Sequence, residues 1–207
     1  MRLILASASP ARLAVLRAAG VDPVVRVSGV DEDALLAGLP GASPDQVVTA
    51  LARAKAQAVA VQARAGYPDA VVVGCDSMLH IDGELVGKPG TAQAARQRWE
   101  QMAGRTGTLI TGHAVLRLDA TAGGCAESAG AESALVRFGT PSPREIEAYV
   151  GTGEPLQVAG AFTLDGRGGW FVDGVDGDPS SIIGISLPLT RRLLAEVGVP
   201  VVALWSP

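Results

Sequence analysis

Short apolar runs that suit buried strands alternate along the first part of this chain with segments that carry helix-start signals. The runs lie at residues 2–6, 23–27 and 70–74, and the third is continuously apolar and rich in valine, as expected of a central strand. Between them, Ser9 and Ser43 each precede a proline and predict two helices, one to Gly20 and one to about residue 65. Gln46 completes a capping box with Ser43. Alternating strands and helices followed by a β-rich middle predict an α/β fold on a mixed sheet.

The rest of the chain adds further elements of both kinds. Strands are predicted at 108–118 and 134–138, and helices at 91–103, 143–150 and 187–197. The pair Asp82-Gly83 predicts a tight hairpin. A stretch rich in Gly, Ala and Ser at 120–131 indicates a flexible loop between two strands, and the acidic run 31–33 indicates a turn.

Composition restricts the class of protein. The net charge is −4 and no basic stripe occurs, so we do not expect a nucleic-acid polymer as partner. The apolar runs are too short for a membrane span, and the first six residues lack the features of a signal peptide. Cys75 and Cys125 are too few for a disulfide framework and have no metal-ligand spacing with His80 or His113. These features predict a cytoplasmic protein whose 207 residues form one domain, with or without two lobes.

Lysine is rare in this sequence, which has only Lys55 and Lys88 among its 17 lysines and arginines. An ammonium group is compact and has three rotatable donors, which suits phosphate oxygens or a position beside a carboxylate. Lys88 lies between Gly87 and Pro89, and Lys55 lies within an alanine-rich predicted helix. An ordinary surface position is an equal alternative for both lysines.

Several other side chains could bind an anion or a metal. Ser7 and Ser9 precede the first predicted helix, whose free N–H groups form an anion site, and Arg12 lies in its first turn. Many α/β proteins begin this way, so an ordinary helix start is the commoner interpretation. Asp76 follows the third apolar run, at the strand end where α/β sheets place ligands, although it could instead cap a turn. Glu32 could equally belong to a solvated acidic cluster.

As a set, these groups are more informative than any one of them. Two carboxylate sites, two lysines and a helix N-terminus are what a metal-assisted attack on a phosphoanhydride requires. The sequence has no Gly-x-x-x-x-Gly-Lys-Ser/Thr loop, which excludes a P-loop nucleotidase. It also has no Gly-x-Ser-x-Gly elbow and no plausible cysteine–histidine nucleophile pair. The set therefore predicts phosphate chemistry that depends on a divalent cation.

At these residues the chain resembles the Maf family of nucleotide pyrophosphatases, and the resemblance runs nearly from end to end. The matching segments are Leu5-Ala6-Ser7-Ala8-Ser9-Pro10 with Arg12, Val30-Asp31-Glu32, Ala52-Arg53-Ala54-Lys55-Ala56, Gly74-Cys75-Asp76-Ser77, Gly87-Lys88-Pro89, Thr111-Gly112, 146–149, Ala159-Gly160-Ala161-Phe162 and Asp176-Gly177-Asp178 leading to Gly184. Their order and spacing together make the resemblance specific. Both lysines fall on the family's lysine positions.

The resemblance implies an elongated α/β fold similar to inosine-triphosphate pyrophosphatases, with two lobes around a central cleft and commonly dimeric. It implies hydrolysis of a nucleoside triphosphate to the monophosphate and pyrophosphate with Mg²⁺ or Mn²⁺. Asp76 corresponds to the family's catalytic aspartate and Glu32 to its acidic partner, and both are expected to hold the metal. Lys55, Lys88 and Arg12 correspond to its phosphate-side cations, and the Ser7 to Ser9 loop is expected to bind the triphosphate. Whether Asp76 acts as base or as ligand stays open.

Departures from the family pattern fall at positions linked to the choice of base. Ala11 stands where the family usually has the first of two basic residues, and Val158 stands where a lysine is expected. Ser77 replaces a typical threonine, and Asp165 stands near an expected glutamine. Ser77 and Asp165 are therefore candidates for base recognition, and a carboxylate at 165 could accept from an amino or imino group of the base. No preferred base follows from the resemblance.

Two other functions remain alternatives. One is a nucleotide-binding regulator of cell division with little or no hydrolysis, and release of pyrophosphate with Mg²⁺ or Mn²⁺ would distinguish the two. The other is a sugar-nucleotide transferase, which is disfavoured because the sequence gives no sign of a second substrate pocket. The leading hypothesis is a pyrophosphatase that removes noncanonical or excess nucleoside triphosphates.

Overall fold

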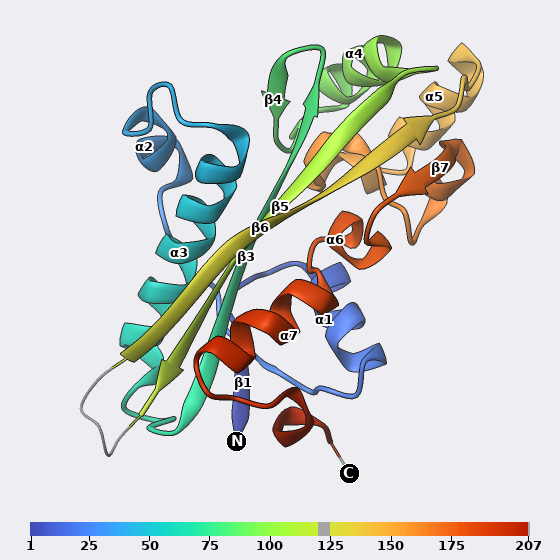
Figure 1. Cartoon of the computed structure of the whole chain (residues 1–207). Helices are drawn as coiled ribbons and strands as arrows, with labels where there is room; N and C mark the ends of the chain where they lie inside the picture. Colours follow the sequence, from blue (N-terminus) through green and yellow to red (C-terminus); the bar gives the residue numbers. More distant parts are fainter. Residues whose placement is uncertain (120–124, 207) are drawn as a thin grey trace. The chain divides into compact units, whose positions relative to one another are not determined.

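The computed structural model of the protein describes residues 1–119 and 125–206. The chain divides into two compact units. The first is made of Met1–Asp76, Thr111–Glu132 and Gly184–Pro207, and the second of Ser77–Ile110 and Ser133–Ile183. Three long strands contribute residues to both units (Figure 1): β3 (Ala70–Ile81), β5 (Thr106–Leu118) and β6 (Cys125–Phe138). Two lobes were one of the arrangements that the sequence allowed.

The first unit contains parallel pairs of strands. Strand β1 (Arg2–Leu5) pairs in parallel with β2 (Val24–Val25) and with β3, where Leu5 lies opposite Val73. The strand order here is β2-β1-β3-β5-β6. Its helices and its short 3-10 turn are α1 (Pro10–Ala18), α2 (Glu32–Ala37), α3 (Pro44–Ala63), α7 (Leu187–Glu196) and η4 (Val201–Leu204).

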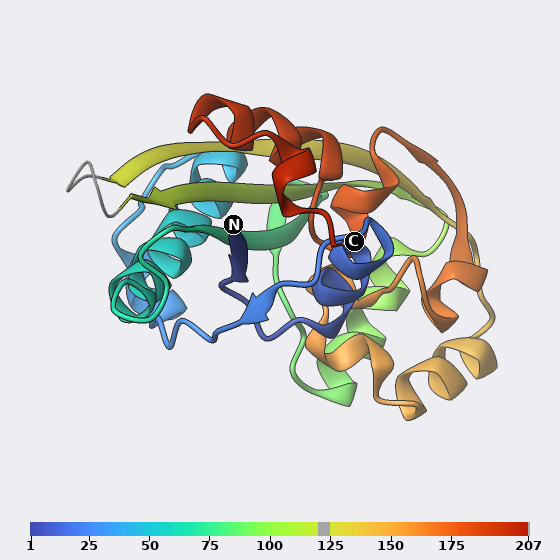
Figure 2. The ribbon, with the colours of Figure 1, turned by 90° about the horizontal axis from the view of Figure 1, so that it is seen from below.

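The strands of the first unit are buried on both faces by aliphatic side chains. Because successive strand residues point to opposite faces, Ile4 and Val72 pack with α3, whereas Leu5 and Val73 pack with α1 and α7. Figure 2 shows α3 and α7 on opposite faces of these strands. The period of two therefore decides which helix each strand residue meets.

Antiparallel pairing characterises the second unit. Strand β4 (Glu84–Val86) pairs with β3, and β7 (Val172–Asp176) pairs with β6, with an irregularity between Arg137 and Phe138. The remaining elements are α4 (Ala92–Met102), α5 (Pro143–Gly151), α6 (Pro179–Ile183) and the 3-10 turns η1 (Glu154–Gln157), η2 (Ala159–Ala161) and η3 (Arg167–Phe171). Parallel and antiparallel pairs in one set of strands make the sheet mixed, as predicted.

An aromatic cluster forms the core of the second unit. The completely buried Trp99 lies edge-on to Phe138, Tyr149 and Phe171, with ring centroids 5.6–5.9 Å apart. Its indole N–H donates to the carbonyl of Ala161 at 2.8 Å. Edge-to-face contacts of this kind add about 1 kcal/mol each beyond burial of the rings.

Most local predictions are confirmed. The predicted helices begin after the expected caps, and both Ser43 with Gln46 and Ser142 with Glu145 form complete capping boxes. The Asp82-Gly83 hairpin joins β3 to β4. In the described part of the chain, no helix combines the length and the apolarity that crossing a membrane would need.

Three predictions need correction. The acidic turn at 31–33 is the start of α2, because the Asp31 carboxylate caps it by accepting from the Ala34 N–H at 3.0 Å. The prediction of a loop at 120–131 is wrong for residues 125–131, because these belong to β6. Residues 120–124 lie outside the described residues. Strand β3 does not end near Gly74 but continues to Ile81, so Asp76 lies inside a strand and not after one.

Candidate active site in the first unit

Helix α3 lies unusually close to the sheet, and two glycines make this possible. A side chain at Gly74 on β3 would come within 2.4 Å of the Ala52 carbonyl oxygen, and one at Gly112 on β5 within 2.2 Å of that of Val48. Real Cβ atoms do not approach backbone so closely, so only glycine fits at either position. The glycines bring the α3 backbone next to β3 at the level of Asp76.

Asp76 and Lys55 form a buried ion pair. Asp76 lies two residues after Gly74 and therefore points to the same face of β3, toward α3. Lys55 lies on the buried face of α3 between Ala52 and Ala56, whose small side chains leave room for its stem. Its Nζ lies 2.5 Å from Asp76 Oδ1, and both residues are less than a tenth exposed. Charges so far from water are stable only when paired.

Glu32 adds a second carboxylate to this pair. It is the first residue of α2, and its Oε1 lies 2.8 Å from Lys55 Nζ. Its side chain is 45% exposed, so Glu32 forms the solvent-facing side of the cluster. Two carboxylates from different elements thus converge on one ammonium group, which is the rare lysine that the sequence singles out.

Ser7, Ser9 and Arg12 form a hydrogen-bonded cluster at the start of α1. The buried Ser7 hydroxyl accepts from the Ser9 N–H at 3.1 Å and from Arg12 Nη1 at 3.0 Å. Ser9 is the N-cap of α1 and accepts from the Arg12 N–H at 3.4 Å. Arg12 Nε also donates to the carbonyl of Gly184 at 2.7 Å. The guanidinium is therefore held at the N-terminal end of a helix, where anions are favoured.

The register of the sheet places both clusters at one level. β1 and β3 run in parallel, Leu5 lies opposite Val73, and the Ala6 N–H extends the pairing by donating to the Val73 carbonyl at 2.8 Å. Ser7 therefore comes two residues after Leu5, and Asp76 comes three residues after its partner Val73. The parallel register thus places the start of α1 and Asp76 at the same level of the sheet.

Cys75 illustrates the electrostatics of this region. Its side chain points to the opposite face from Asp76 and is completely buried among aliphatic residues. Burial is the main cause that raises the pKa of the thiol to about 11, and the charges of Arg12, Asp76 and Lys55 act on it more weakly. A thiol with this pKa stays protonated at neutral pH, so Cys75 is no nucleophile there.

The carboxylates of Glu32 and Asp76 fit a hard divalent cation. Their oxygens already converge on one positive charge, that of Lys55. Mg²⁺ is commonly held by one or two carboxylates together with substrate phosphates. Within the described ranges there is no group of three or more His, Cys, Asp or Glu side chains that could hold a metal.

The other predicted site residues belong to the second unit. Ser77 lies in β3, Lys88 is exposed after β4, and Asp165 is exposed in the segment between η2 and η3. Beside Asp165, Glu154 Oε1 accepts from the Thr163 hydroxyl at 2.6 Å and from the Gly168 N–H at 3.1 Å. These bonds fix the ends of the segment that carries Asp165. The roles of Ser77, Lys88 and Asp165 stay predictions.

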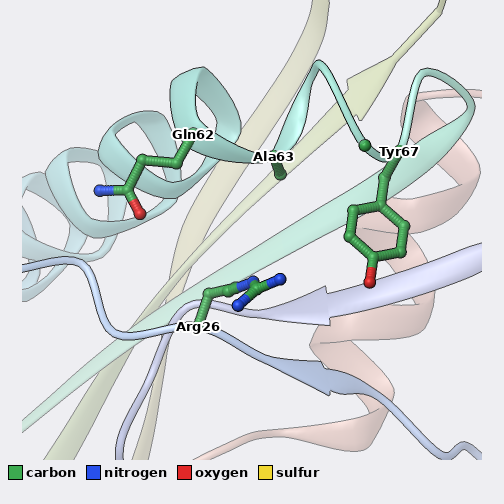
Figure 3. A pocket seen from close by; sticks show the side chains of 5 residues that line it. Arg26, Gln62, Ala63 and Tyr67 are labelled. Atoms are coloured by element: carbon green, nitrogen blue, oxygen red, sulfur yellow. The ribbon is translucent and has the colours of Figure 1, made fainter.

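A shallow pocket of about 260 Å³ lies elsewhere in the first unit (Figure 3). It is lined by Arg26, Gln62, Ala63, Gly66 and Tyr67. None of the predicted site residues lines it. We therefore keep the residues around Asp76 as the candidate active site.

Sequence reasoning did not assign roles to the glycines that shape this site. Gly74, Gly112 and Gly184 occur in the segments that resemble the family, but their function appears only from contacts across the fold. A glycine inside a strand pattern signals close approach of another backbone, and this signal was present at Gly74 and Gly112. No comparable signal points to the contact of Gly184 with Arg12.

Comparisons with known proteins show the family of this chain. Residues 2–197 match the family model described as "Maf-like protein". A protein of Saccharopolyspora erythraea is 64% identical over 100% of this chain and 98% of its own length, and one of Rhodococcus opacus is 66% identical over 98% and 95%. Both are named nucleoside triphosphate pyrophosphatase. The family match spans nearly the whole chain, and this chain belongs to the Maf family.

Proposed function

We propose that this protein hydrolyses nucleoside triphosphates to the monophosphate and pyrophosphate. The observation that carries the proposal is the convergence of Glu32 and Asp76 on Lys55. The same unit contains Arg12, whose guanidinium donates to the Ser7 hydroxyl. Phosphoanhydride hydrolysis needs little covalent chemistry from a protein, because positioning and charge stabilisation supply most of the rate. The names of the similar proteins support the same reaction.

Each group has a role in this proposal. Asp76 orients a water molecule and takes its proton as the water attacks the α-phosphorus. Lys55, Arg12 and the Ser7 to Ser9 loop bind the triphosphate, and Lys88 stabilises the charge on the leaving pyrophosphate. Cys75 takes no part, because its thiol stays protonated at neutral pH.

The proposal includes a divalent cation, Mg²⁺ or Mn²⁺, held by Glu32 and Asp76. Such an ion, when bound, supplies positive charge to the phosphate oxygens. Because Lys55 bonds to both carboxylates, we expect the ion to bind weakly to the protein alone and more tightly with nucleotide. Calorimetric titration with Mn²⁺, with and without a non-hydrolysable nucleotide, measures this difference.

Noncanonical or modified nucleotides are the proposed substrates, with Ser77 and Asp165 contributing to base selection. In this proposal the protein acts in the cytoplasm, as a homodimer, on free nucleotides and not on nucleic-acid polymers. Substitution of Ser77 or Asp165 is expected to change the ranking of nucleotides; an unchanged ranking would remove both from base selection.

The decisive experiment is a pyrophosphate-release screen over standard and modified nucleoside triphosphates with Mg²⁺ or Mn²⁺. Asp76→Asn is nearly isosteric but cannot accept a proton, and we expect it to lower kcat by about a thousandfold. Asp69→Asn is the matched control, because Asp69 is an exposed partner of Arg117 in the same unit and should keep wild-type kcat.

Each outcome of the screen has a clear meaning. Retention of most activity by Asp76→Asn would refute its role as base. A wild-type protein that binds nucleotides but releases no pyrophosphate from any of them would favour the alternative of a nucleotide-binding regulator.

A further inference from the structure

The segment that joins α6 to α7 presents a backbone carbonyl to Arg12. Gly184 O accepts from Arg12 Nε at 2.7 Å. Gly184 has φ +125°, and a Cβ there would lie 3.0 Å from the same Nε. Position 184 therefore favours glycine for its backbone conformation, and a Cβ there would also crowd the guanidinium. The direction of this carbonyl fixes one edge of the Arg12 guanidinium.

Two residues later, Ser186 ties this segment to β5. Its N–H donates to His113 Nε2 at 2.8 Å, and its hydroxyl caps α7 by accepting from the Leu189 N–H at 3.1 Å. Ser186 and His113 are both completely buried. Between Gly184 and Ser186, Ile185 packs in the aliphatic core. The short segment is thus anchored immediately beside the carbonyl that Arg12 uses.

The hydrogen bonds of His113 define its protonation. Nε2 accepts from the Ser186 N–H, so this nitrogen carries no proton. Nδ1 lies 3.0 Å from the Thr111 carbonyl oxygen, so it must be the donor. His113 is therefore a neutral imidazole with its proton on Nδ1. It is not a candidate for proton transfer to substrate, because both nitrogens are used inside the fold.

We propose that His113 is a positioning residue that acts on Arg12 through Ser186 and Gly184. The imidazole fixes the peptide that enters α7, this peptide fixes the Gly184 carbonyl, and the carbonyl orients the Arg12 guanidinium beside Ser7. The inference rests on the proposed function only for the role of Arg12 in phosphate binding. The contacts themselves belong entirely to the first unit.

A matched pair of variants tests this relay. His113→Gln places an amide oxygen near the position of Nε2 and can still accept from Ser186. His113→Asn has the same functional group but is too short, so it can replace only the bond to Thr111. We expect His113→Asn to weaken binding of inorganic pyrophosphate with Mg²⁺ by about tenfold and His113→Gln by less than about threefold. Equal losses in both variants would overturn the proposal.

A double-mutant cycle distinguishes positioning from general destabilisation. In an Arg12→Ala background, His113→Asn should weaken pyrophosphate binding by less than about twofold, because the residue on which it acts is gone. A loss as large as in the wild-type background would show that His113 does not work through Arg12. Urea unfolding of all variants measures any change in stability separately.

Nuclear magnetic resonance tests the relay without any substrate. In the wild-type protein we expect the Nδ1–H tautomer of His113 and an Arg12 Nε–H that is protected from exchange with water. His113→Asn should speed this exchange about tenfold, and His113→Gln should keep it close to the wild-type rate. The opposite tautomer, or an unprotected Arg12 Nε–H in the wild type, would contradict the proposal. A wild-type protein that binds no pyrophosphate would instead count against the proposed function.

Discussion

The two units of this protein bury different kinds of side chain. The first has cores of aliphatic residues, with polar and charged side chains such as Lys55, Asp76 and His113 buried beside them. The second has an aromatic core around Trp99, and Ser181 is its only fully buried polar residue within the described ranges. The first unit contains the parallel pairs of β1 with β2 and β3, whereas the second contains the antiparallel pairs of β4 with β3 and of β7 with β6.

This difference separates the requirements of packing from those of chemistry. Aromatic rings fill the second unit with few residues, and their polar atoms form hydrogen bonds from Trp99 to Ala161 and between Tyr149 and Thr163. In the first unit, the close approach of α3 requires glycine and alanine, and the space that these leave holds a lysine stem. Its buried charges cost free energy unless paired, which is acceptable where the pair has a function.

The largest predicted effect on stability is in the second unit. Trp99→Ala removes a completely buried indole and its hydrogen bond, and should lower the free energy of unfolding by about 4 kcal/mol. Trp170→Ala is the matched control. Because Trp170 is 87% exposed, this substitution should change the free energy of unfolding by less than about 0.5 kcal/mol. Urea denaturation measures both. Similar values for the two variants would show that the aromatic cluster is not the core of this unit.

The next effect concerns activity and belongs to the first unit. Lys55→Met keeps the length of the side chain but leaves Glu32 and Asp76 without their shared ammonium, and kcat/KM should fall about 100-fold. Arg17→Met is the control, because Arg17 forms only an exposed pair with Asp22. Pyrophosphate release measures both. If Lys55→Met kept wild-type kcat/KM, the buried pair would be structural and not catalytic.

Alkaline pH should destabilise both units through different groups. Burial raises the pKa of Cys75 to about 11 in the first unit and that of Tyr149 to about 12 in the second. For each group the pKa in the folded protein exceeds the pKa in the unfolded chain. Its contribution to the free energy of unfolding is therefore complete below the unfolded pKa and is lost as pH rises through the folded pKa. Cys75 alone should cost about 2 kcal/mol at pH 11.

Conservative variants assign this loss to each group. Cys75→Ala should flatten the fall in unfolding free energy between pH 9 and 11, and Tyr149→Phe that between pH 10 and 12. Urea unfolding across this pH range gives both slopes. Unchanged slopes would mean that neither group titrates differently on unfolding.

The smallest effects compare the two capping boxes. Ser43→Ala in the first unit should lower stability by about 1 kcal/mol at any pH, because its partner Gln46 does not titrate. In the second unit, hydrogen bonds from Ser142 lower the pKa of Glu145. The contribution of these bonds to stability is therefore present above about pH 4.5 and is lost in acid. Ser142→Ala should therefore cost less at pH 3 than at pH 7. Thermal unfolding at both pH values checks this, and equal costs would contradict it.

Much of the fold and part of the site could be predicted from local sequence. Ser9 and Ser43 cap their helices as expected, because capping depends on residues within one turn. The scarcity of lysine singled out Lys55 before any contact was known. Helix α2 was missed because its charges were interpreted as a turn, although Asp31 is an ordinary N-cap.

Local patterns in the chain were enough to predict most helix starts, the alternation of strands with helices, and the family with its expected residues. Three features appear only in the folded structure: β3 continues past Gly74, Lys55 joins two carboxylates, and Gly184 holds Arg12. The two contacts join residues that are far apart along the chain. Lys55 and Asp76 are 21 residues apart, and Arg12 and Gly184 are 172 apart, so these contacts depend on how helices pack on the sheet. No pattern within one turn or one strand encodes such packing.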